Sequence, residues 1–141
     1  MHISKIFLTV DIVVSKLYNN KTTVLLIKRR NNPFKNFWAL PGGFVDENED
    51  LEAAAIRELQ EETSIKIESL EQLKAFGKPF RDPRNHTVSV AFLGFVQDET
   101  IAIAADDAME VKWFSIDELP ELAFDHDEII NFALSKIKKI E

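Results

Sequence analysis

Along this 141-residue chain, some segments have the pattern of apolar and polar residues that is typical of β-strands, and others have the pattern that is typical of helices. β-Branched and aromatic residues dominate positions 6–14 and 22–27, and this composition predicts two strands. The YNNK sequence at 18–21 is a turn signal because Asn tolerates positive φ, so we expect an antiparallel hairpin. Residues 86–96 (HTVSVAFLGFV) have the clearest strand pattern and predict a strand inside the sheet.

Two segments have helical character. Residues 51–63 are rich in Glu, Ala and Leu, which favour helices, and Asn48 or Asp50 is placed to cap the start. Residues 125–140 repeat apolar side chains at helical spacing, with lysines near the end, where the helix dipole favours cations.

Shorter elements complete the pattern. Residues 73–76 and 110–114 predict strands, while 115–118 (SIDE) match a capping box and predict a helical turn that Pro120 ends. Antiparallel strands, one central helix and a C-terminal helix predict an α+β fold or an α/β/α sandwich. No repeat or linker divides the chain, so we expect a single domain over residues 1–141.

Composition narrows the classes of protein. The chain is 45% hydrophobic and 29% charged, and it contains no Cys, which excludes disulfides, thiolate metal sites and Cys nucleophiles. No uncharged apolar run approaches the roughly 20 residues of a membrane span, and the N-terminus lacks a cleavage site. We therefore expect a cytoplasmic protein without a membrane partner.

The net charge of −7 argues against general nucleic-acid binding. Basic residues nevertheless cluster at 28–30 and again at 78–84. Such clusters in an acidic protein suit a bound metal–polyphosphate, although solvated loop charges explain them equally well.

The most informative stretch is 41–65 (PGGFVDENEDLEAAAIRELQEETSI). At about 100° per residue, Glu58, Glu61 and Glu62 fall on one face of the predicted helix, where like charges repel one another. A divalent cation would neutralise them, so the segment predicts a hard-metal site rather than a solvated acidic face. Gly42 and Gly43 precede it and permit a close backbone approach or unusual dihedral angles.

The spacing within this stretch resembles the Nudix box, G-x5-E-x7-R-E-U-x-E-E-x-G-U, where U is aliphatic. Gly43, Glu49, Arg57 and the three carboxylates occupy their motif positions. Ser64 stands where the family has Gly, and a non-Gly residue in a left-handed helix end costs about 1 kcal/mol. The resemblance covers nearly the whole chain and implies a Nudix-type α/β/α sandwich with a mixed central β-sheet.

The resemblance also implies residue roles. Glu58, Glu61 and Glu62 would hold Mg²⁺, with Mn²⁺ as the alternative, helped by the main-chain carbonyl of Gly42. Glu58 or Glu61 would also act as base. Arg57 and Glu49 would form an ion pair that orients the helix.

Further residues extend the expected site. Asp107 matches an additional acid that many family members carry before the penultimate strand, although a plain loop acid is equally consistent. Guanidinium groups match phosphate geometry and aromatic rings stack bases, so the expected substrate-binding residues are Arg29, Phe34, Phe80, Arg81 and Arg84. We interpret His126 as a buried or capping histidine rather than a catalyst.

The segments FRDPRNHTVSVAFLGFV and LAFDHDEII resemble the branch that contains ADP-ribose pyrophosphatases and Nudix-related repressors of NAD metabolism. This implies Mg²⁺-dependent hydrolysis of a nucleoside diphosphate derivative, with ADP-ribose giving AMP and ribose 5-phosphate. The alternatives are an ADP-ribose sensor with little catalysis, or an enzyme for nucleoside triphosphates or sugar nucleotides.

Expectations about partners follow from the same resemblance. The repressors carry a C-terminal winged-helix domain, for which this sequence has no segment, so we expect no nucleic-acid partner and a small nucleotide as ligand. Many family members form homodimers, and the 11 Phe residues are compatible with an apolar interface.

Overall fold

The computed structural model describes the backbone of residues 1–140 and the side chains of residues 1–138. Nine helices and strands follow one another over this range. They are β1 (Phe7–Tyr18), β2 (Lys21–Arg29), β3 (Trp38–Ala39), β4 (Gly42–Phe44), α1 (Leu51–Thr63), β5 (Glu71–Phe76), β6 (Thr87–Phe95), β7 (Ala108–Ser115) and α2 (His126–Ile140).

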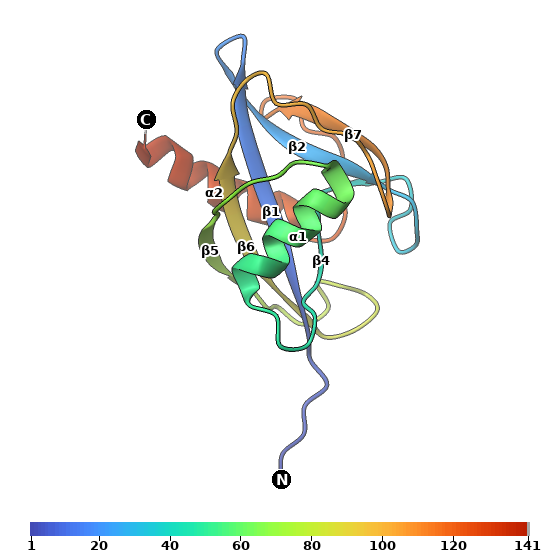
Figure 1. Ribbon diagram of the computed structural model, residues 1–141. Coiled ribbons are helices and arrows are strands. Elements are labelled where there is room, and N and C mark those ends of the chain that lie inside the picture. Colours follow the sequence, from blue (N-terminus) through green and yellow to red (C-terminus); the bar gives the residue numbers. More distant parts are fainter. Residues whose placement is uncertain (141) are drawn as a thin grey trace.

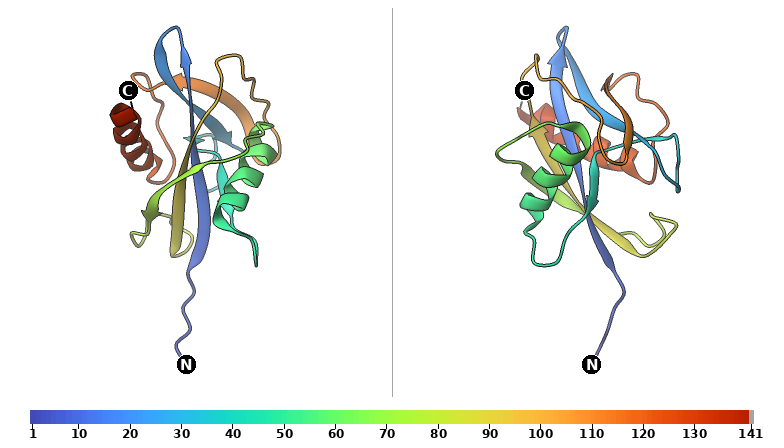
Figure 2. Two further views of the ribbon diagram at one scale, coloured as in Figure 1. Left: turned by 60° about the vertical axis from the view of Figure 1, so that its left-hand side comes forward. Right: turned by 45° about the vertical axis from the view of Figure 1, so that its right-hand side comes forward.

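The sheet lies between the two helices, with α1 on one face and α2 on the other (Figures 1 and 2). The alternation along β1 explains this layering: Val10 and Ile12 join the core cluster of α1, and Val13 joins that of α2. The predicted α/β/α sandwich is confirmed. Within the described range, neither helix combines the length and apolar composition needed to cross a membrane.

The strands form a mixed sheet in the order β3-β2-β1-β6-β5, with β4 beside β1 and β7 beside β2. β1 and β6 are parallel over the whole length of β6, and the other pairs are antiparallel. β6 lies between β1 and β5, as its continuous apolar sequence predicts.

β1 and β2 form the predicted hairpin but separate soon after the turn. Their pairing runs only from Tyr18 opposite Lys21 to Ser15 opposite Val24. Further along, β1 pairs instead with β4, where Asp11 lies opposite Gly42. The divergence of β1 and β2 creates an opening in the sheet that β4 only partly fills.

α1 has the predicted bounds, and both of its ends depart from regular helix. Asp50 is the N-cap in an extended conformation, without a side-chain capping hydrogen bond. Ser64 follows the helix at φ 65°, and its N–H donates to the Gln60 carbonyl at 2.9 Å. Ser64 thus adopts the left-handed conformation for which Gly is the usual residue.

Three short elements differ from the sequence predictions. β3 and β4 were not predicted, because strands of two and three residues are too short to show alternation. Residues 115–118 form a turn rather than the expected helical turn. The Glu118 N–H donates to the Ser115 carbonyl at 3.0 Å, and Pro120 removes the N–H that a following turn would use.

His126, the first residue of α2, joins the helix to the sheet. Its Nδ1 accepts a hydrogen bond from the Leu40 N–H at 3.0 Å, and its Nε2 lies 3.5 Å from Asp11 Oδ1. Asp11 also accepts from the Ser89 hydroxyl at 2.5 Å. Burial lowers the pKa of His126, so the ring is neutral. This agrees with the interpretation of His126 as a buried, hydrogen-bonded histidine.

This neutral histidine predicts a loss of stability in acid. Below pH 6.5 the histidine becomes protonated in the unfolded chain, whereas burial keeps it neutral in the folded protein. The free energy of unfolding therefore falls as the pH decreases. The loss develops between pH 7.5 and 5.5, as the unfolded histidine becomes protonated, and cannot exceed about 1.4 kcal/mol for each pH unit. Urea unfolding of the wild type and His126→Gln at both pH values measures it. An equal acid sensitivity of the two proteins would contradict the assignment.

Candidate active site

The opening between β1 and β2 leads into a cavity that we call the inner cavity. Strand residues, the end of α1 and two loops surround it. Its lining comprises Thr9, Asp11, Ile27, Arg29, Leu40, Gly42, Gly43, Glu62, Arg81, Asp82, Arg84, Thr87, Phe124 and His126. Residues from both basic clusters therefore meet a carboxylate of the Nudix-box helix.

A second cavity, the outer cavity, adjoins the first. Both are lined by Ile27, Arg29, Gly42, Glu62 and Arg84. The outer cavity adds residues 30–32, Phe44 and Asp107. The predicted acid of the 98–107 loop thus shares a cavity with Glu62.

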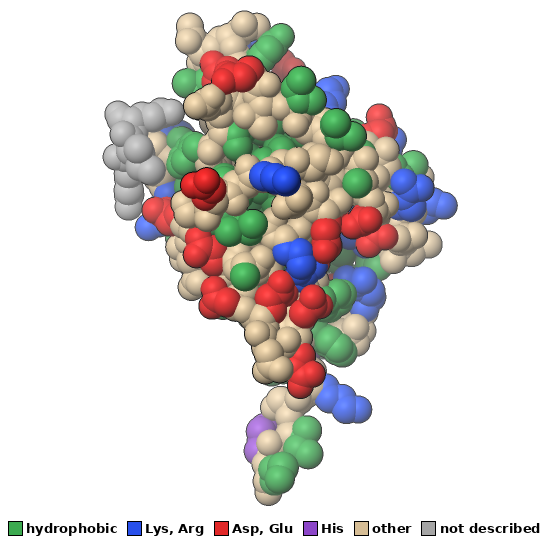
Figure 3. Space-filling view, viewed as in Figure 1, with side chains coloured by type: hydrophobic (Ala, Val, Ile, Leu, Met, Phe, Trp, Pro, Cys, Tyr) green, Lys and Arg blue, Asp and Glu red, His purple; other side chains and the backbone are tan. Residues whose placement is uncertain are grey.

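Arg57 organises the carboxylates on the outer face of α1. Its Nε lies 2.7 Å from Glu49, and one terminal nitrogen lies 2.9 Å from Glu58 and 3.2 Å from Glu61. The other terminal nitrogen donates to the Phe44 carbonyl at 3.1 Å. Hydrogen bonds from Arg57 lower the pKa of Glu49 to about 2. The expected Arg57–Glu49 pair is present. Arg57 also neutralises part of the negative charge of Glu58 and Glu61, which the sequence analysis expected a metal ion to neutralise. Figure 3 shows this mixture of acidic and basic side chains over α1.

Glu62 points the other way, into the sheet. It is 6% exposed, and its Oε1 accepts from the Gly42 N–H at 2.8 Å. Burial raises the pKa of Glu62 to about 8 despite that hydrogen bond. Burial also raises the pKa of Glu58, against the effect of Arg57. Both carboxylates therefore lie where a cation would stabilise their charged form.

Close approach of the β1 backbone requires Gly at position 42, and Gly43 lies against the Glu58 carboxylate. Neither has positive φ, so the unusual dihedral angles considered from sequence are not used. A Cβ on Gly43 would lie 2.5 Å from the Glu58 carboxylate carbon, and one on Gly42 would overlap the Val10 carbonyl. The absence of side chains lets β4 lie directly between β1 and α1.

The three predicted arginines line the inner cavity but differ in their partners. Arg81 is bound by Asp125 at 2.6 Å, and Arg84 by Asp82 at 2.8 Å. Arg29 forms no ion pair among the described residues, and its Nε donates to the Pro33 carbonyl at 2.9 Å. Burial and the neighbouring Arg84 lower the pKa of Arg29, and the carboxylates of Glu62, Asp82 and Asp107 oppose this shift. A bound anion would add to that stabilisation of the charged guanidinium.

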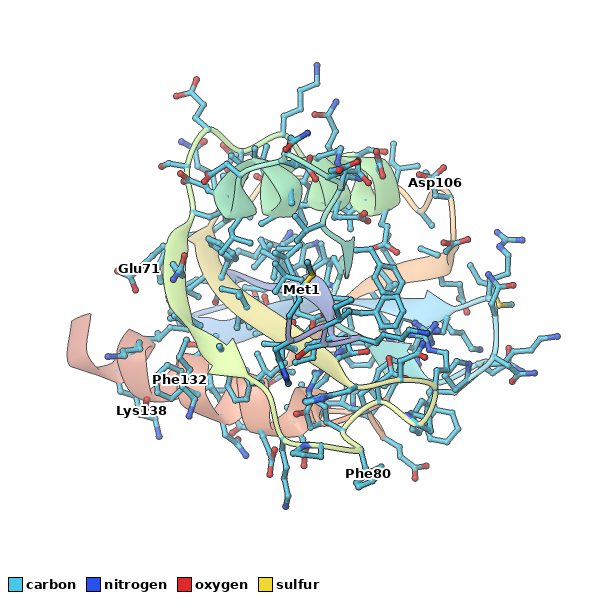
Figure 4. The ribbon with its side chains drawn as sticks, turned by 90° about the horizontal axis from the view of Figure 1, so that it is seen from below. Met1, Glu71, Phe80, Asp106, Phe132 and Lys138 are labelled. Atoms are coloured by element: carbon cyan, nitrogen blue, oxygen red, sulfur yellow. The ribbon has the colours of Figure 1, made fainter. Side chains whose placement is uncertain are left out.

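The predicted stacking residues lie elsewhere. Phe80 is 92% exposed and points outward, away from α1 and from Asp106 (Figure 4), so it lines neither cavity. The ring of Phe34 packs edge-on against Phe37 and Phe124, at 5.5 and 4.8 Å between centroids. Phe34 is therefore a packing residue beneath the loop, and neither ring supports the expected stacking role.

Phe124, to which the sequence reasoning assigned no role, is a phenylalanine that does reach the inner cavity. It lines the inner cavity, and the guanidinium groups of Arg29 and Arg84 lie 5.0 and 5.8 Å from its ring centroid. Asp82, also unassigned, is 4% exposed and orients Arg84. Both lie in the segments RDPR and AFDH that carry the family resemblance; Asp82 adjoins the assigned Arg81, whereas no assigned site residue adjoins Phe124.

The carboxylates of α1 suit a divalent cation chemically. They supply oxygen ligands from neighbouring positions of one helix, and burial raises the pKa values of Glu58 and Glu62, which a bound cation would lower. Among the described side chains, no three acidic or imidazole groups are gathered closely enough to form a ready metal site. The contacts of Arg57 and of the Gly42 N–H explain this, since they draw Glu58 and Glu61 away from Glu62.

Comparison with known proteins identifies the family. Residues 8–132 match the model of the NUDIX domain. The ADP-ribose pyrophosphatase of Methanocaldococcus jannaschii is 43% identical over 128 residues, which are 89% of this chain and 74% of that protein.

Two further relatives belong to a regulatory group. The ADPR responsive transcriptional repressor NtrR of Acinetobacter baylyi is 33% identical over 92% of this chain, which spans only 54% of the repressor. The NUDIX domain of Shewanella oneidensis NrtR, solved with ADP ribose, superposes with a TM-score of 0.87 at 34% identity. That alignment covers 96% of this chain and 90% of that domain. By family model, motif and fold, the chain belongs to the Nudix family of pyrophosphohydrolases.

Proposed function

We propose that this protein hydrolyses ADP-ribose to AMP and ribose 5-phosphate in a reaction that depends on Mg²⁺. One observation carries the proposal: the unpaired guanidinium of Arg29 and the buried carboxylate of Glu62 line the same cavities. A diphosphate bound to Arg29 would face a cation held at Glu62, and this pairing suits the neutralisation of a phosphoryl group.

Each side of the site has a distinct task in this proposal. Glu58, Glu61 and Glu62 would hold the cation together with the Gly42 carbonyl, and Mn²⁺ is the alternative ion. The bound ion would polarise a phosphoryl oxygen and lower the pKa of water. Glu58 or Glu61 would accept the proton of the attacking water.

The remaining residues would bind and orient the substrate. Arg29 would bind the diphosphate, and Arg84, fixed by Asp82, would supply a second guanidinium over Phe124. Arg81 is already bound by Asp125 on two of its nitrogens, at 2.9 and 2.6 Å, so we assign it to positioning the 81–84 loop. Asp107 would contribute an acid from the opposite wall.

The choice of ADP-ribose rests on the relatives. A protein 43% identical to this chain is an ADP-ribose pyrophosphatase, and a similar NUDIX domain binds ADP ribose. The repressor relatives favour a second candidate, an ADP-ribose sensor without turnover. The Ser64 departure from the motif is compatible with that sensor, but α1 ends after Thr63 in the left-handed conformation expected of the motif, which favours the enzyme. The absence of a nucleic-acid partner and the homodimer stay predictions.

The first prediction is the reaction itself. Purified protein with Mg²⁺ should release AMP from ADP-ribose, and removal of the metal by EDTA should abolish the release. Chromatography of the nucleotide products measures both. Calorimetric binding of ADP-ribose without turnover would favour the sensor, and inactivity on a panel of nucleotides would refute the enzyme.

Glu61→Gln should lower kcat at least about 100-fold, because the amide removes a charged oxygen ligand from the proposed cation site. The fold should be unaffected, since the Glu61 side chain is 43% exposed. Glu71→Gln is the matched control: Glu71 is exposed and lies far from Asp106 (Figure 4). Similar kinetics for the two variants would contradict the role of Glu61.

Arg29→Ala should raise KM for ADP-ribose on the order of 10-fold, because a charge-assisted hydrogen bond to phosphate is lost. Lys28→Ala removes the adjacent cation of β2, which is paired with Glu110 at 3.4 Å, and should leave KM unchanged. Steady-state kinetics on the two variants separates a specific phosphate contact from a general loss of positive charge. An equal rise in KM would refute the specific contact.

A further inference from the structure

Ser64 makes a contact that the glycine of the motif could not make. Its Oγ donates to the Ile103 carbonyl at 3.1 Å. The backbone conformation at φ 65° is unfavourable for a residue with a Cβ and free of that penalty for Gly. Relative to Gly, Ser64 therefore adds one hydrogen bond and at the same time makes the local backbone conformation less favourable.

The partner of this contact belongs to the loop between β6 and β7. Two further bonds join the loop to the end of α1: the Ile103 N–H donates to the Thr63 carbonyl at 2.8 Å, and the Ala105 N–H to the Glu62 carbonyl at 3.1 Å. Ile101 and Ile103 are 78% and 63% exposed, so their side chains do little to hold the loop. Three hydrogen bonds to residues 62–64 therefore attach the loop to α1, beside the packing of Ala102 against the core cluster that includes Leu59.

The same loop carries Asp107. The Ala108 N–H donates to the Ala105 carbonyl at 3.1 Å, closing a turn in which Asp106 has φ 53°. The Asp107 carbonyl accepts from the Arg30 N–H at 3.2 Å. Asp107 is thus held between the end of α1 and the end of β2, and Figure 4 shows Asp106 beside α1.

We propose that Ser64 is a positioning residue: its hydroxyl fastens the 101–107 loop to α1 and so holds Asp107 opposite Glu62 in the outer cavity. The proposal rests on the proposed function, in which both carboxylates serve hydrolysis. Because Ala105 is bonded to the backbone of Glu62 itself, a loosened loop would change the separation of the two acids directly.

If Ser64 positions the loop, Ser64→Gly should change stability and activity in opposite directions, whereas a merely tolerated replacement of Gly predicts no loss of activity. Ser64→Gly relieves the left-handed backbone while removing the hydroxyl, so its urea midpoint should equal or exceed that of the wild type. Its kcat should nevertheless fall about 3-fold to 10-fold, the range for loss of one such hydrogen bond. Ser64→Ala keeps the unfavourable backbone conformation and also removes the hydroxyl. Its urea midpoint should therefore be lower than that of the wild type, and its kcat should fall by the same factor as in Ser64→Gly.

A double-mutant cycle with Asp107→Asn tests whether Ser64 acts through Asp107. Ser64→Gly should slow hydrolysis in the wild type but add less than about 2-fold to the loss in Asp107→Asn. An unchanged or higher kcat for Ser64→Gly, or an equal further loss in the Asp107→Asn background, would overturn the proposal.

Amide hydrogen exchange supplies a readout that does not need activity. Exchange in residues 101–107 should accelerate about 3-fold to 10-fold in both Ser64 variants, while the core amides of β6 stay unchanged. If the wild type hydrolyses neither ADP-ribose nor other nucleotides, the proposed function fails, and unaccelerated exchange would by itself refute the attachment of the loop by Ser64.

Discussion

The arrangement of the site depends on a single guanidinium. Arg57 reaches Glu49 before the helix, Glu58 and Glu61 along it, and the Phe44 carbonyl of β4. One side chain therefore fixes the direction of α1 relative to the strand that carries Gly42 and Gly43. Without it, Glu58 and Glu61 would repel each other on adjacent turns, and nothing else among the described side chains would bind both.

The sheet supplies the other half of the site by separating two of its strands. β1 pairs with β2 near their turn and with β4 beyond it, and this change of partner leaves room for a cavity lined by four strands. The buried contacts among His126, Asp11 and Leu40 stabilise the floor of this opening. Structural polar residues therefore lie directly beneath the residues proposed to bind substrate.

The parts of this structure that follow local rules were predictable, and those that depend on tertiary partners were not. The bounds of α1, the β1–β2 hairpin and the position of β6 follow from composition and periodicity. Glu62, proposed from the motif spacing, and Arg29, proposed from its basic cluster, both line the cavities, and their roles stay predictions. Which arginines are available to a ligand depends on ion pairs between residues far apart in the sequence. Arg81 and Arg29 were equivalent candidates, but Asp125, 44 residues away, forms an ion pair with Arg81. Likewise, nothing local distinguishes exposed Phe80 from Phe124, which the packing of the loop brings to the cavity.

The closeness of Gly43 to Glu58 has a consequence for how such a protein can diversify. In the proposed function most of the carboxylates lie on α1 and its approach, with Asp107 added from the loop between β6 and β7, whereas the residues proposed to bind substrate lie on β2 and on loops after β5 and before α2. The two groups of residues meet across a backbone without side chains. If the proposed roles hold, substitutions in the loops that line the inner cavity would alter which nucleotide is accepted without moving the carboxylates of α1, and a new substrate would require no rebuilding of the helix.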